Sequence, residues 1–381
     1  MRIINGVFII LFMTMLTLPL AFVNLSKDRV SVQENRMLAG RPSPADIKNH
    51  PGKFIKQFDA WFKDSTGFRK YLLALFNIMD KSKWLNGFMY TDGQYTYLVG
   101  EEGHHYFANV GGKLIQKFQG KQFLSDEQML NMANKLEDVK RYLERQNIPF
   151  VVMFCADKES IYPEFYPKFI IRGSDPIQLD VITNYLHENT SVDVFNIKEA
   201  LLAKKNNYLL YYKIDTMSFA SDFAHYNQIG AFLAYLELMK HINAYFPRIV
   251  PYGLHDINID YDGKGIPAVS LKAETVYKKQ DVSFFDNVDL IRPFTWENEA
   301  YENRDPDLPK VLFLRDSYTS EQFLGKYFAQ HFGTAVFIHY ANASNFEEFV
   351  SLYKPDIVVF ESAERALENF ANCIAGIPEL P

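Results

Sequence analysis

Helical segments alternate along this chain with short apolar runs, and this alternation constrains the fold more than any other feature. The runs are continuous, as in Pro149 to Cys155, without apolar–polar alternation. Strands covered by helices on both faces have this composition. The pattern therefore predicts an α/β fold, with a mainly parallel sheet sandwiched between helices. The predicted strands are 149–155, 192–195, 209–212, 311–314, 335–338 and 357–360, and the helices that alternate with them are 125–146, 181–188, 197–204, 230–246 and 346–353.

The bulk composition excludes two broad classes of protein. With 381 residues the chain can bury a large core and hold one large domain or two ordinary ones. A net charge of −6 provides no basic field to recruit nucleic acid, and no nucleic-acid motif occurs. The mean hydropathy of −0.17 excludes a polytopic membrane protein. We therefore expect a globular protein without a nucleic-acid partner.

An uncharged run of 18 residues, Gly6 to Val23, lies near the N-terminus. Its length is close to the lower limit for crossing a bilayer, and Arg2 favours a cytoplasmic N-terminus. We predict a signal anchor over residues 1–24, which would be one helix in the cytoplasmic membrane. A cleaved signal peptide ending near Ala21 and a buried helix are the alternatives. Anchor and signal peptide both place the remaining chain outside the cytoplasm, on the periplasmic or cell-surface side.

Composition also divides the rest of the chain. Residues 25–52 are polar and contain Pro42 and Pro44, which indicates a linker or arm. The main domain is predicted over residues 53–381. Within it, residues 251–309 carry Gly- and Asp-rich turns typical of an insertion or a lid.

Two cysteines are present, Cys155 and Cys373. An oxidising compartment permits a disulfide between them. Cys155 falls inside a predicted buried strand, however, where a free thiol packs as a small apolar group. Both interpretations stay open. Two cysteines without clustered histidines make no zinc site, so no metal is expected.

The first candidate for chemistry is Ser317, which follows Asp316 just after the predicted strand 311–314. Ligands gather at the carboxyl ends of strands in open α/β sheets, because loops and helix N-termini converge there. Residues 320–328 can form a helix whose free N–H groups would favour an oxyanion beside the serine. The other interpretation is that Asp316 or Ser317 only caps that helix.

A serine hydroxyl is a weak nucleophile until a base removes its proton. His225, just before the predicted helix 230–246, is the candidate base, because imidazole suits proton transfer near neutral pH. A carboxylate that fixes the imidazole tautomer would be Asp222, three residues earlier, or Asp215, ten residues earlier. A lone histidine near a helix start is commonly structural, but its occurrence with Ser317 favours the catalytic interpretation.

A series of short motifs follows along the chain: Glu34-Asn35-Arg36-Met37-Leu38, Asp64 to Arg69, Gly100 to Phe107, Asp157-Lys158 with Ile161-Tyr162-Pro163, Tyr211 to Thr216, Leu314 to Tyr318, Lys354-Pro355-Asp356 and Glu364-Arg365. In this order they resemble the AlgJ/AlgX-like alginate O-acetyltransferases and the related DHHW proteins. The resemblance covers most of the chain after the N-terminal run. It implies an SGNH-hydrolase-like, three-layer α/β/α sandwich with a mainly parallel sheet, preceded here by the membrane anchor helix.

Two positions depart from the family pattern. Met217 stands after Asp-Thr, where the family carries its catalytic histidine. His225 has the family's spacing to Gly230, so we assign the base to His225. Arg315 replaces the glycine that precedes the family's Asp-Ser pair, and a side chain there can crowd the site or change the acceptor.

The resemblance implies an O-acetyltransferase that modifies a cell-surface polysaccharide through a serine acyl-enzyme. Ser317 would attack the donor ester, and its backbone N–H would help to bind the oxyanion. A multipass membrane acyltransferase would supply the acetyl group, and no cofactor is needed. The candidate substrate-binding side chains near the strand ends are Lys158, Tyr162, Tyr212, Arg315 and Tyr318.

Two other functions remain. A carbohydrate esterase would use the same residues with water as the acceptor. A non-catalytic glycan-binding subunit of a polysaccharide assembly machine is the hypothesis that Met217 and Arg315 favour. A distance of about 3 Å between Ser317 Oγ and a ring nitrogen of His225 supports an enzyme.

Overall fold

The computed structural model describes residues 12–14, 17, 30–31, 36–37, 39–43, 51–65, 89–92, 95–108, 113–174, 176–213, 224–261, 267–272, 277–280, 298–303, 305, 307–320 and 324–381. The chain divides into two compact units, Met1–Gly87 and Phe88–Pro381, and each is described by itself.

The described part of the first unit includes one longer helix and a short antiparallel strand pair. Within the described ranges, no helix is long and apolar enough to cross a bilayer. Of the predicted anchor run 6–23, only residues 12–14 and 17 are described, so that prediction lies almost wholly outside them. The elements are β1 (Val30–Ser31), β2 (Arg36–Met37) and α3 (Pro51–Ser65).

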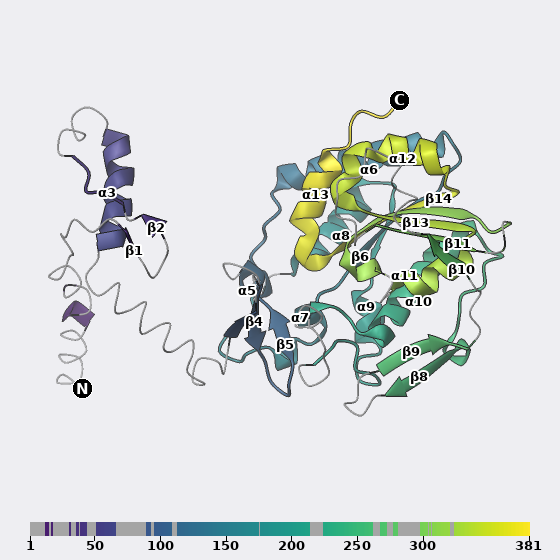
Figure 1. The fold of residues 1–381 in the computed structure, drawn as a ribbon, viewed down its shortest axis with the longest axis horizontal. Helices are drawn as coiled ribbons and strands as arrows, with labels where there is room; N and C mark the ends of the chain where they lie inside the picture. The colour runs from purple at the N-terminus through teal and green to yellow at the C-terminus, as the bar shows by residue number, and fades with distance from the viewer. Residues whose placement is uncertain are drawn as a thin grey trace. The chain divides into compact units, whose positions relative to one another are not determined.

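A seven-stranded mixed sheet forms the centre of the second unit, in the order β10-β11-β13-β12-β14-β6-β7 (Figure 1). Strands β13, β12, β14, β6 and β7 are parallel neighbours, whereas β11 and β10 extend the sheet antiparallel. The predicted α/β fold is confirmed, and its sheet is mixed. The strands are β6 (Phe150–Cys155), β7 (Asp193–Asn196), β10 (Tyr277–Gln280), β11 (Glu299–Asn303), β12 (Lys310–Arg315), β13 (Thr334–His339) and β14 (Ile357–Ala363).

Helices cover both faces of this sheet (Figure 1). The chain moves from β12 to β13 through α11 and then back past β12 to β14 through α12. Because parallel crossovers are right-handed, these two helices fall on opposite faces. Helices α6, α8 and α13 share the face of α12, and α9 and α10 share that of α11. The bounds are α5 (Lys113–Phe118), α6 (Asp126–Glu144), α7 (Lys158–Ile161), α8 (Gln178–Asn189), α9 (Lys198–Leu202), α10 (Gln228–Tyr245), α11 (Leu324–Phe328), α12 (Phe346–Tyr353) and α13 (Leu367–Ala375).

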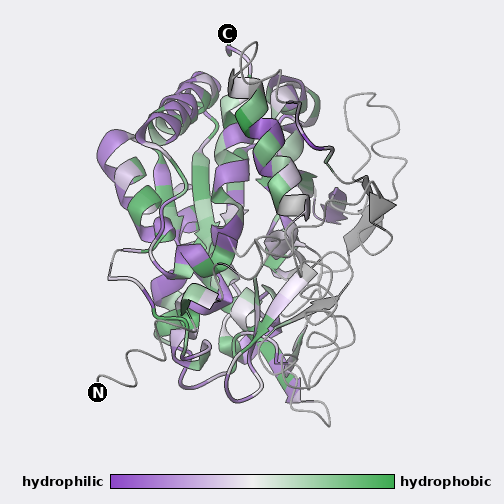
Figure 2. Cartoon of the chain, turned by 90° about the vertical axis from the view of Figure 1, so that its left-hand side faces the viewer, coloured by the Kyte–Doolittle hydropathy of each residue, from purple (hydrophilic) through white to green (hydrophobic). Residues whose placement is uncertain are grey.

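Burial explains why the central strands lack alternation. Every residue of β6 and β14 is buried, because helices pack on both sides. Figure 2 shows hydrophobic residues along the central strands and hydrophilic residues on the helices outside them. Phe360 in β14 packs against Phe150, Phe346 and Phe370, with ring centroids 4.9, 5.5 and 6.5 Å away.

Local sequence signals set two helix boundaries. A capping box begins α6, since the side chains of Ser125 and Gln128 each accept the backbone N–H of the other residue. Helix α12 ends at Lys354, whose φ of 46° is left-handed, and Pro355 cannot continue the helix.

One predicted strand, 209–212, is wrong. The segment forms only a single bridge, between Tyr211 and Tyr226, outside the sheet. Its backbone is satisfied elsewhere, because Leu210 N–H donates to the Tyr162 hydroxyl at 3.1 Å and Leu210 O accepts from Asn227 N–H at 2.8 Å. An apolar run thus forms a buried loop when its polar groups find partners off the sheet.

Smaller elements and the cysteines complete the unit. The predicted helix 320–328 is described only as α11, and residues 321–323 lie outside the described ranges. Both cysteines are free, with Cys155 buried in β6 and Cys373 on α13, so the predicted alternative of a disulfide is not formed. A three-stranded antiparallel sheet comprises β3 (Met89–Asp92), β4 (Tyr95–Val99) and β5 (His105–Phe107), and a hairpin comprises β8 (Ile257–Tyr261) and β9 (Pro267–Leu271).

The packing around β14 gives a stability prediction. Phe360→Ala should lower the free energy of unfolding by about 3–5 kcal/mol, because the ring is fully buried among three other rings. Urea denaturation followed by circular dichroism measures this change in the free energy of unfolding. The control is Leu352→Ala on α12, where the side chain is 53% exposed and the change should stay within about 0.5 kcal/mol. Equal losses in both variants would contradict the assigned core.

Candidate active site

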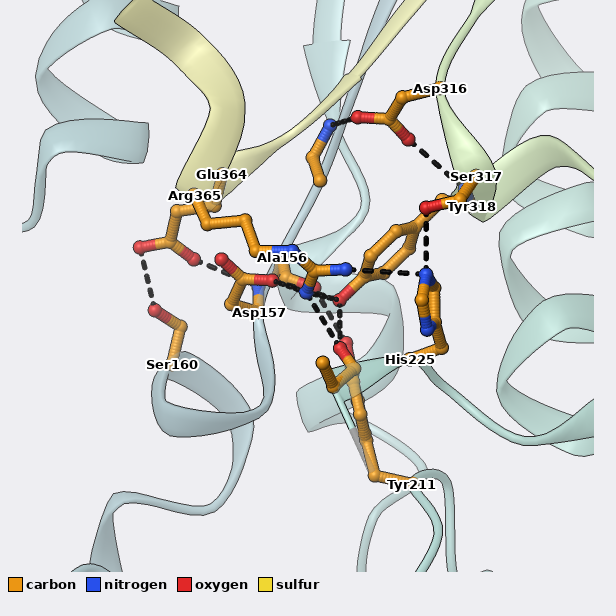
Figure 3. Close-up of polar contacts among 12 residues, drawn as sticks. Ala156, Asp157, Ser160, Tyr211, His225, Asp316, Ser317, Tyr318, Glu364 and Arg365 are labelled. Carbon is orange, nitrogen blue, oxygen red and sulfur yellow. Dashed lines mark hydrogen bonds and ion pairs between the residues drawn. The ribbon is translucent and has the colours of Figure 1, made fainter. Parts of the chain in front are cut away.

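The carboxyl ends of three adjacent strands bring charged and nucleophilic residues together (Figure 3). Strand β12 leads into Asp316 and Ser317, β6 into Asp157, and β14 into Arg365. Strands β12, β14 and β6 lie side by side and parallel, so their ends open at one edge of the sheet.

Asp316 fixes the turn that carries the serine. It precedes the 3-10 helix η8 (Ser317–Thr319) as its N-cap, and its Oδ1 accepts the N–H of Tyr318 at 3.0 Å. Its Oδ2 accepts the N–H of Ala363, at the end of β14, at 2.8 Å. Asp316 therefore caps η8 and not the predicted helix 320–328. The capping leaves the hydroxyl of Ser317 for other contacts.

A buried carboxyl group supports this turn from the neighbouring strand. Glu361 in β14 accepts the N–H of Asp316 at 3.1 Å and the hydroxyl of Thr319 at 2.9 Å. Burial, followed by the charge of Asp316, raises the pKa of Glu361 well above its usual value. Sequence reasoning missed this residue, although a single carboxylate in the apolar run Ile357–Ala363 was a usable signal.

The predicted nucleophile and base are in contact. His225 Nε2 lies 2.7 Å from Ser317 Oγ (Figure 3). The same Nε2 lies 3.2 Å from NH2 of Arg365, which can only donate. Nε2 must therefore be an acceptor in this arrangement, which places the ring proton of neutral His225 on Nδ1. An unprotonated Nε2 facing a serine hydroxyl is the geometry of general-base activation.

The start of α10 holds His225 in place. Asn227 caps this helix, because its Oδ1 accepts the N–H groups of Ile229 at 3.0 Å and Gly230 at 3.1 Å. Its Nδ2 donates to the carbonyl of Leu209 at 2.6 Å. A Cβ at Gly230 would meet the carbonyl oxygen of Leu210 at 2.5 Å, so only glycine allows this close approach.

The carboxylate that would orient His225 is not placed. Asp215 and Asp222 fall within residues 214–223, outside the described ranges, and so does Met217. The choice between the two carboxylates stays a prediction.

Three predicted substrate-binding residues face the loop before α10. Lys158 is buried, and its Nζ donates to the carbonyls of His105 at 2.8 Å and Tyr212 at 2.7 Å. Burial lowers the pKa of Lys158 to about 7. Tyr162 is also buried, and its hydroxyl donates to the carbonyl of Tyr208 at 3.3 Å. Lys158 and Tyr162 thus anchor the protein's own backbone, whereas Tyr212 is half-buried.

The other two predicted substrate-binding residues, Arg315 and Tyr318, are fully buried. NH1 of Arg315 donates to the carbonyl of Asp316 at 3.0 Å, and NH2 lies 3.3 Å from Glu299 Oε2. Arg315 therefore engages β11 and its own turn rather than the hydroxyl of Ser317. A substrate contact of this side chain stays a prediction.

An ion pair between Asp157 and Arg365, which sequence reasoning did not assign, contacts the dyad formed by Ser317 and His225. NH1 of Arg365 donates to Asp157 Oδ1 at 2.7 Å, to the carbonyl of Ala224 at 2.8 Å and to the hydroxyl of Tyr318 at 3.0 Å. Burial opposes the charge on Arg365, but Tyr318 and Asp157 outweigh it and raise its pKa, so the guanidinium stays charged. Burial raises the pKa of Asp157. The usable signal was a charged residue two positions after each of these buried strands, β6 and β14.

Glu364 completes this buried cluster. Its Oε2 accepts the N–H of Asp157 at 2.9 Å, and its Oε1 accepts the hydroxyl of Ser160 at 2.8 Å. Burial, followed by the charge of Asp157, raises the pKa of Glu364 to about 7. Across the described ranges, no group of three or more His, Cys, Asp and Glu side chains could hold a metal ion.

The mixed α/β fold contains a segment that is similar to an SGNH hydrolase-like domain. Residues 117–251 match the family model of the SGNH hydrolase-like domain of acetyltransferase AlgX. This match confirms the predicted resemblance over a segment that contains His225, whereas Ser317 and Arg365 follow it. No curated protein matches the sequence.

Solved structures with a similar arrangement include three bacterial proteins. PatB1 of Bacillus cereus has a TM-score of 0.48 and 14% identity, covering 73% of this chain and 96% of its own. A DHHW family protein of Eubacterium siraeum has a TM-score of 0.49 and 13% identity, covering 76% and 97%. The O-acetyltransferase domain of Pseudomonas putida AlgJ has a TM-score of 0.44 and 12% identity, covering 73% and 98%.

The raised pKa of Glu364 predicts a pH dependence of stability. Its folded pKa of about 7 exceeds the ordinary value of 4.5, so the folded state holds a proton that the unfolded state releases between these values. This contribution is fully present below pH 4.5 and lost as the pH rises through 7. Relative to Glu364→Gln, the wild type should therefore lose stability between pH 5 and 7.5.

Urea denaturation of both proteins at the two pH values measures their free energies of unfolding. The difference between the two proteins removes the contribution of titrating groups that both contain. Glu348→Gln, an exposed glutamate on α12, is the matched control and should leave the pH dependence unchanged. If wild type and Glu364→Gln varied in parallel with pH, the carboxyl would have an ordinary pKa in the folded protein.

Proposed function

We propose that this chain is an O-acetyltransferase that modifies a cell-surface polysaccharide through an acyl-enzyme on Ser317. The observation that carries the proposal is the 2.7 Å contact between Ser317 Oγ and His225 Nε2 at the carboxyl end of β12. The match to the AlgX-type acetyltransferase domain supports acetyl as the transferred group.

The reaction would proceed in two halves. His225 Nε2 takes the proton of Ser317 Oγ as this oxygen attacks the donor carbonyl, and the same proton then leaves with the departing alcohol. The acetyl group remains bonded to Ser317. His225 Nε2 next deprotonates a sugar hydroxyl, which attacks the acetyl carbonyl; the bond between this carbonyl and Ser317 Oγ then breaks, and Oγ recovers the proton from Nε2. The backbone N–H of Ser317, at the start of η8, is proposed to stabilise the oxyanion, and Asp222 or Asp215 to orient the imidazole.

The same proposal places the domain outside the cytoplasm. Residues 1–24 would hold it to the cytoplasmic membrane, and residues 25–52 would link it to the domain over 53–381. A multipass membrane acyltransferase would deliver the acetyl group, since the proposed chemistry needs a donor ester on that side of the membrane.

The two alternative functions differ in the acceptor and in the need for chemistry. A carbohydrate esterase would use the same dyad with water as acceptor. A glycan-binding subunit would not need an aligned base and nucleophile. Arg315 no longer favours that subunit, because its guanidinium contacts Glu299 and the Asp316 carbonyl.

The proposal is tested with the purified full chain and a chromogenic acetyl ester. Ser317→Ala and His225→Ala should each lower the rate of ester cleavage by about 10³-fold or more, because the nucleophile or its base is lost. Mass spectrometry of the wild type should find one acetyl group on the peptide that contains Ser317. Ser351→Ala, an exposed serine on α12, is the matched control and should acylate as the wild type does.

Adding an oligosaccharide acceptor separates the two enzymes. Faster turnover with acetylated sugar as product supports the transferase, whereas acetate alone supports the esterase. A wild type that is no faster than Ser317→Ala and never becomes acetylated would leave glycan binding as the function.

A further inference from the structure

Arg365 occupies a position that the two-residue mechanism leaves unexplained. It lies two residues after β14, the strand that pairs with β12, and its guanidinium reaches the imidazole of His225 (Figure 3). Its terminal nitrogens have different surroundings. NH1 is held by three oxygen atoms, those of Asp157, Ala224 and Tyr318, whereas NH2 lies 3.2 Å from His225 Nε2.

The contact between NH2 and Nε2 is compatible with only one protonation state of the histidine. Neutral His225 offers Nε2 as an acceptor to both the guanidinium and the Ser317 hydroxyl. Once Nε2 takes the serine proton, it becomes a donor, and two donors then face each other. NH2 therefore loses its partner in the same step in which negative charge develops on the donor ester beside Ser317.

We propose that Arg365 is a catalytic residue whose NH2 leaves His225 during acylation and donates to the oxyanion of the acyl group. The inference rests on the proposed acyl-enzyme function. Ser317 Oγ forms a bond to the carbonyl carbon, and the π electrons of the carbonyl move to its oxygen, where NH2 binds. When the intermediate collapses, those electrons reform the carbonyl. The leaving alcohol takes the proton from Nε2, and NH2 returns to the imidazole.

Three features of the site suit this role. A guanidinium is always charged, and its planar donors let one nitrogen stay fixed while the other serves the reaction. Asp157 is buried and bonded to NH1 at 2.7 Å, which holds the cation beside the reacting atoms. Little reorganisation energy is therefore needed when the oxyanion forms. NH2 and Ser317 Oγ both contact the same Nε2, which makes them neighbours at the point of attack.

The test compares single-turnover acylation of the full-length protein by a chromogenic acetyl ester in the wild type, Arg365→Lys and Arg365→Ala. The lysine variant keeps the charge opposite Asp157 but has one donor group in place of two. We expect its acylation rate to fall about 10²-fold, with KM within about threefold, because the lost contact exists only in the transition state. Methylguanidinium in the buffer should restore part of the rate of Arg365→Ala, and should do nothing for Arg365→Lys.

Arg141→Lys is the matched control, because Arg141 is an exposed arginine on α6 and its replacement should leave the rate unchanged. If Arg365→Lys acylates at the wild-type rate, the inference is wrong whether or not Arg365→Ala folds. A folded Arg365→Ala protein that is slow but gains nothing from methylguanidinium also overturns it. A wild type that never acylates Ser317 instead overturns the proposed function itself.

Discussion

The buried ion pair between Asp157 and Arg365 is the interaction on which the site depends. It joins the ends of β6 and β14, and the same guanidinium contacts Tyr318 of η8, so three strand ends are connected by one side chain. Such a pair contributes little net stability, because both charges lose their hydration. Removing one partner is costly, however, since the other charge would remain buried. The pair therefore specifies an arrangement more than it stabilises the fold.

The sequence predicted the parallel part of the sheet and the contact between Ser317 and His225. Continuous apolar runs predicted the parallel strands, and the position of Ser317 after such a run predicted its meeting with His225, 92 residues away. Strand 209–212 was wrong, because apolar composition does not distinguish a buried loop from a buried strand. The antiparallel β10 and β11 were not predicted, since their residues, Tyr277–Gln280 and Glu299–Asn303, are largely polar.

The roles of the buried charges were beyond sequence reasoning for a different reason. A carboxylate such as Glu361 or Glu364 gains its function from partners that are distant along the chain and from the low dielectric around it. The same limit explains Lys158. Its position near a strand end led to the prediction that it binds substrate, whereas its Nζ lies 2.7 Å from the carbonyl oxygen of Tyr212. A charged residue just after a strand indicates where the site lies. Its burial then decides whether the side chain can bind substrate or instead binds the protein's own groups.

Asp316 binds the backbone of its own turn through one oxygen and the end of β14 through the other. Asp316 thereby joins the backbone beside the nucleophile to the strand end that precedes Arg365, and these two backbone segments have little freedom to shift independently. His225 comes from a separate segment, in front of α10. Any adjustment of the catalytic pair to substrates of different size must therefore be a displacement of the imidazole. The selectivity of such a centre would be encoded in the loop that carries the base, and the same nucleophile scaffold could serve different acceptors.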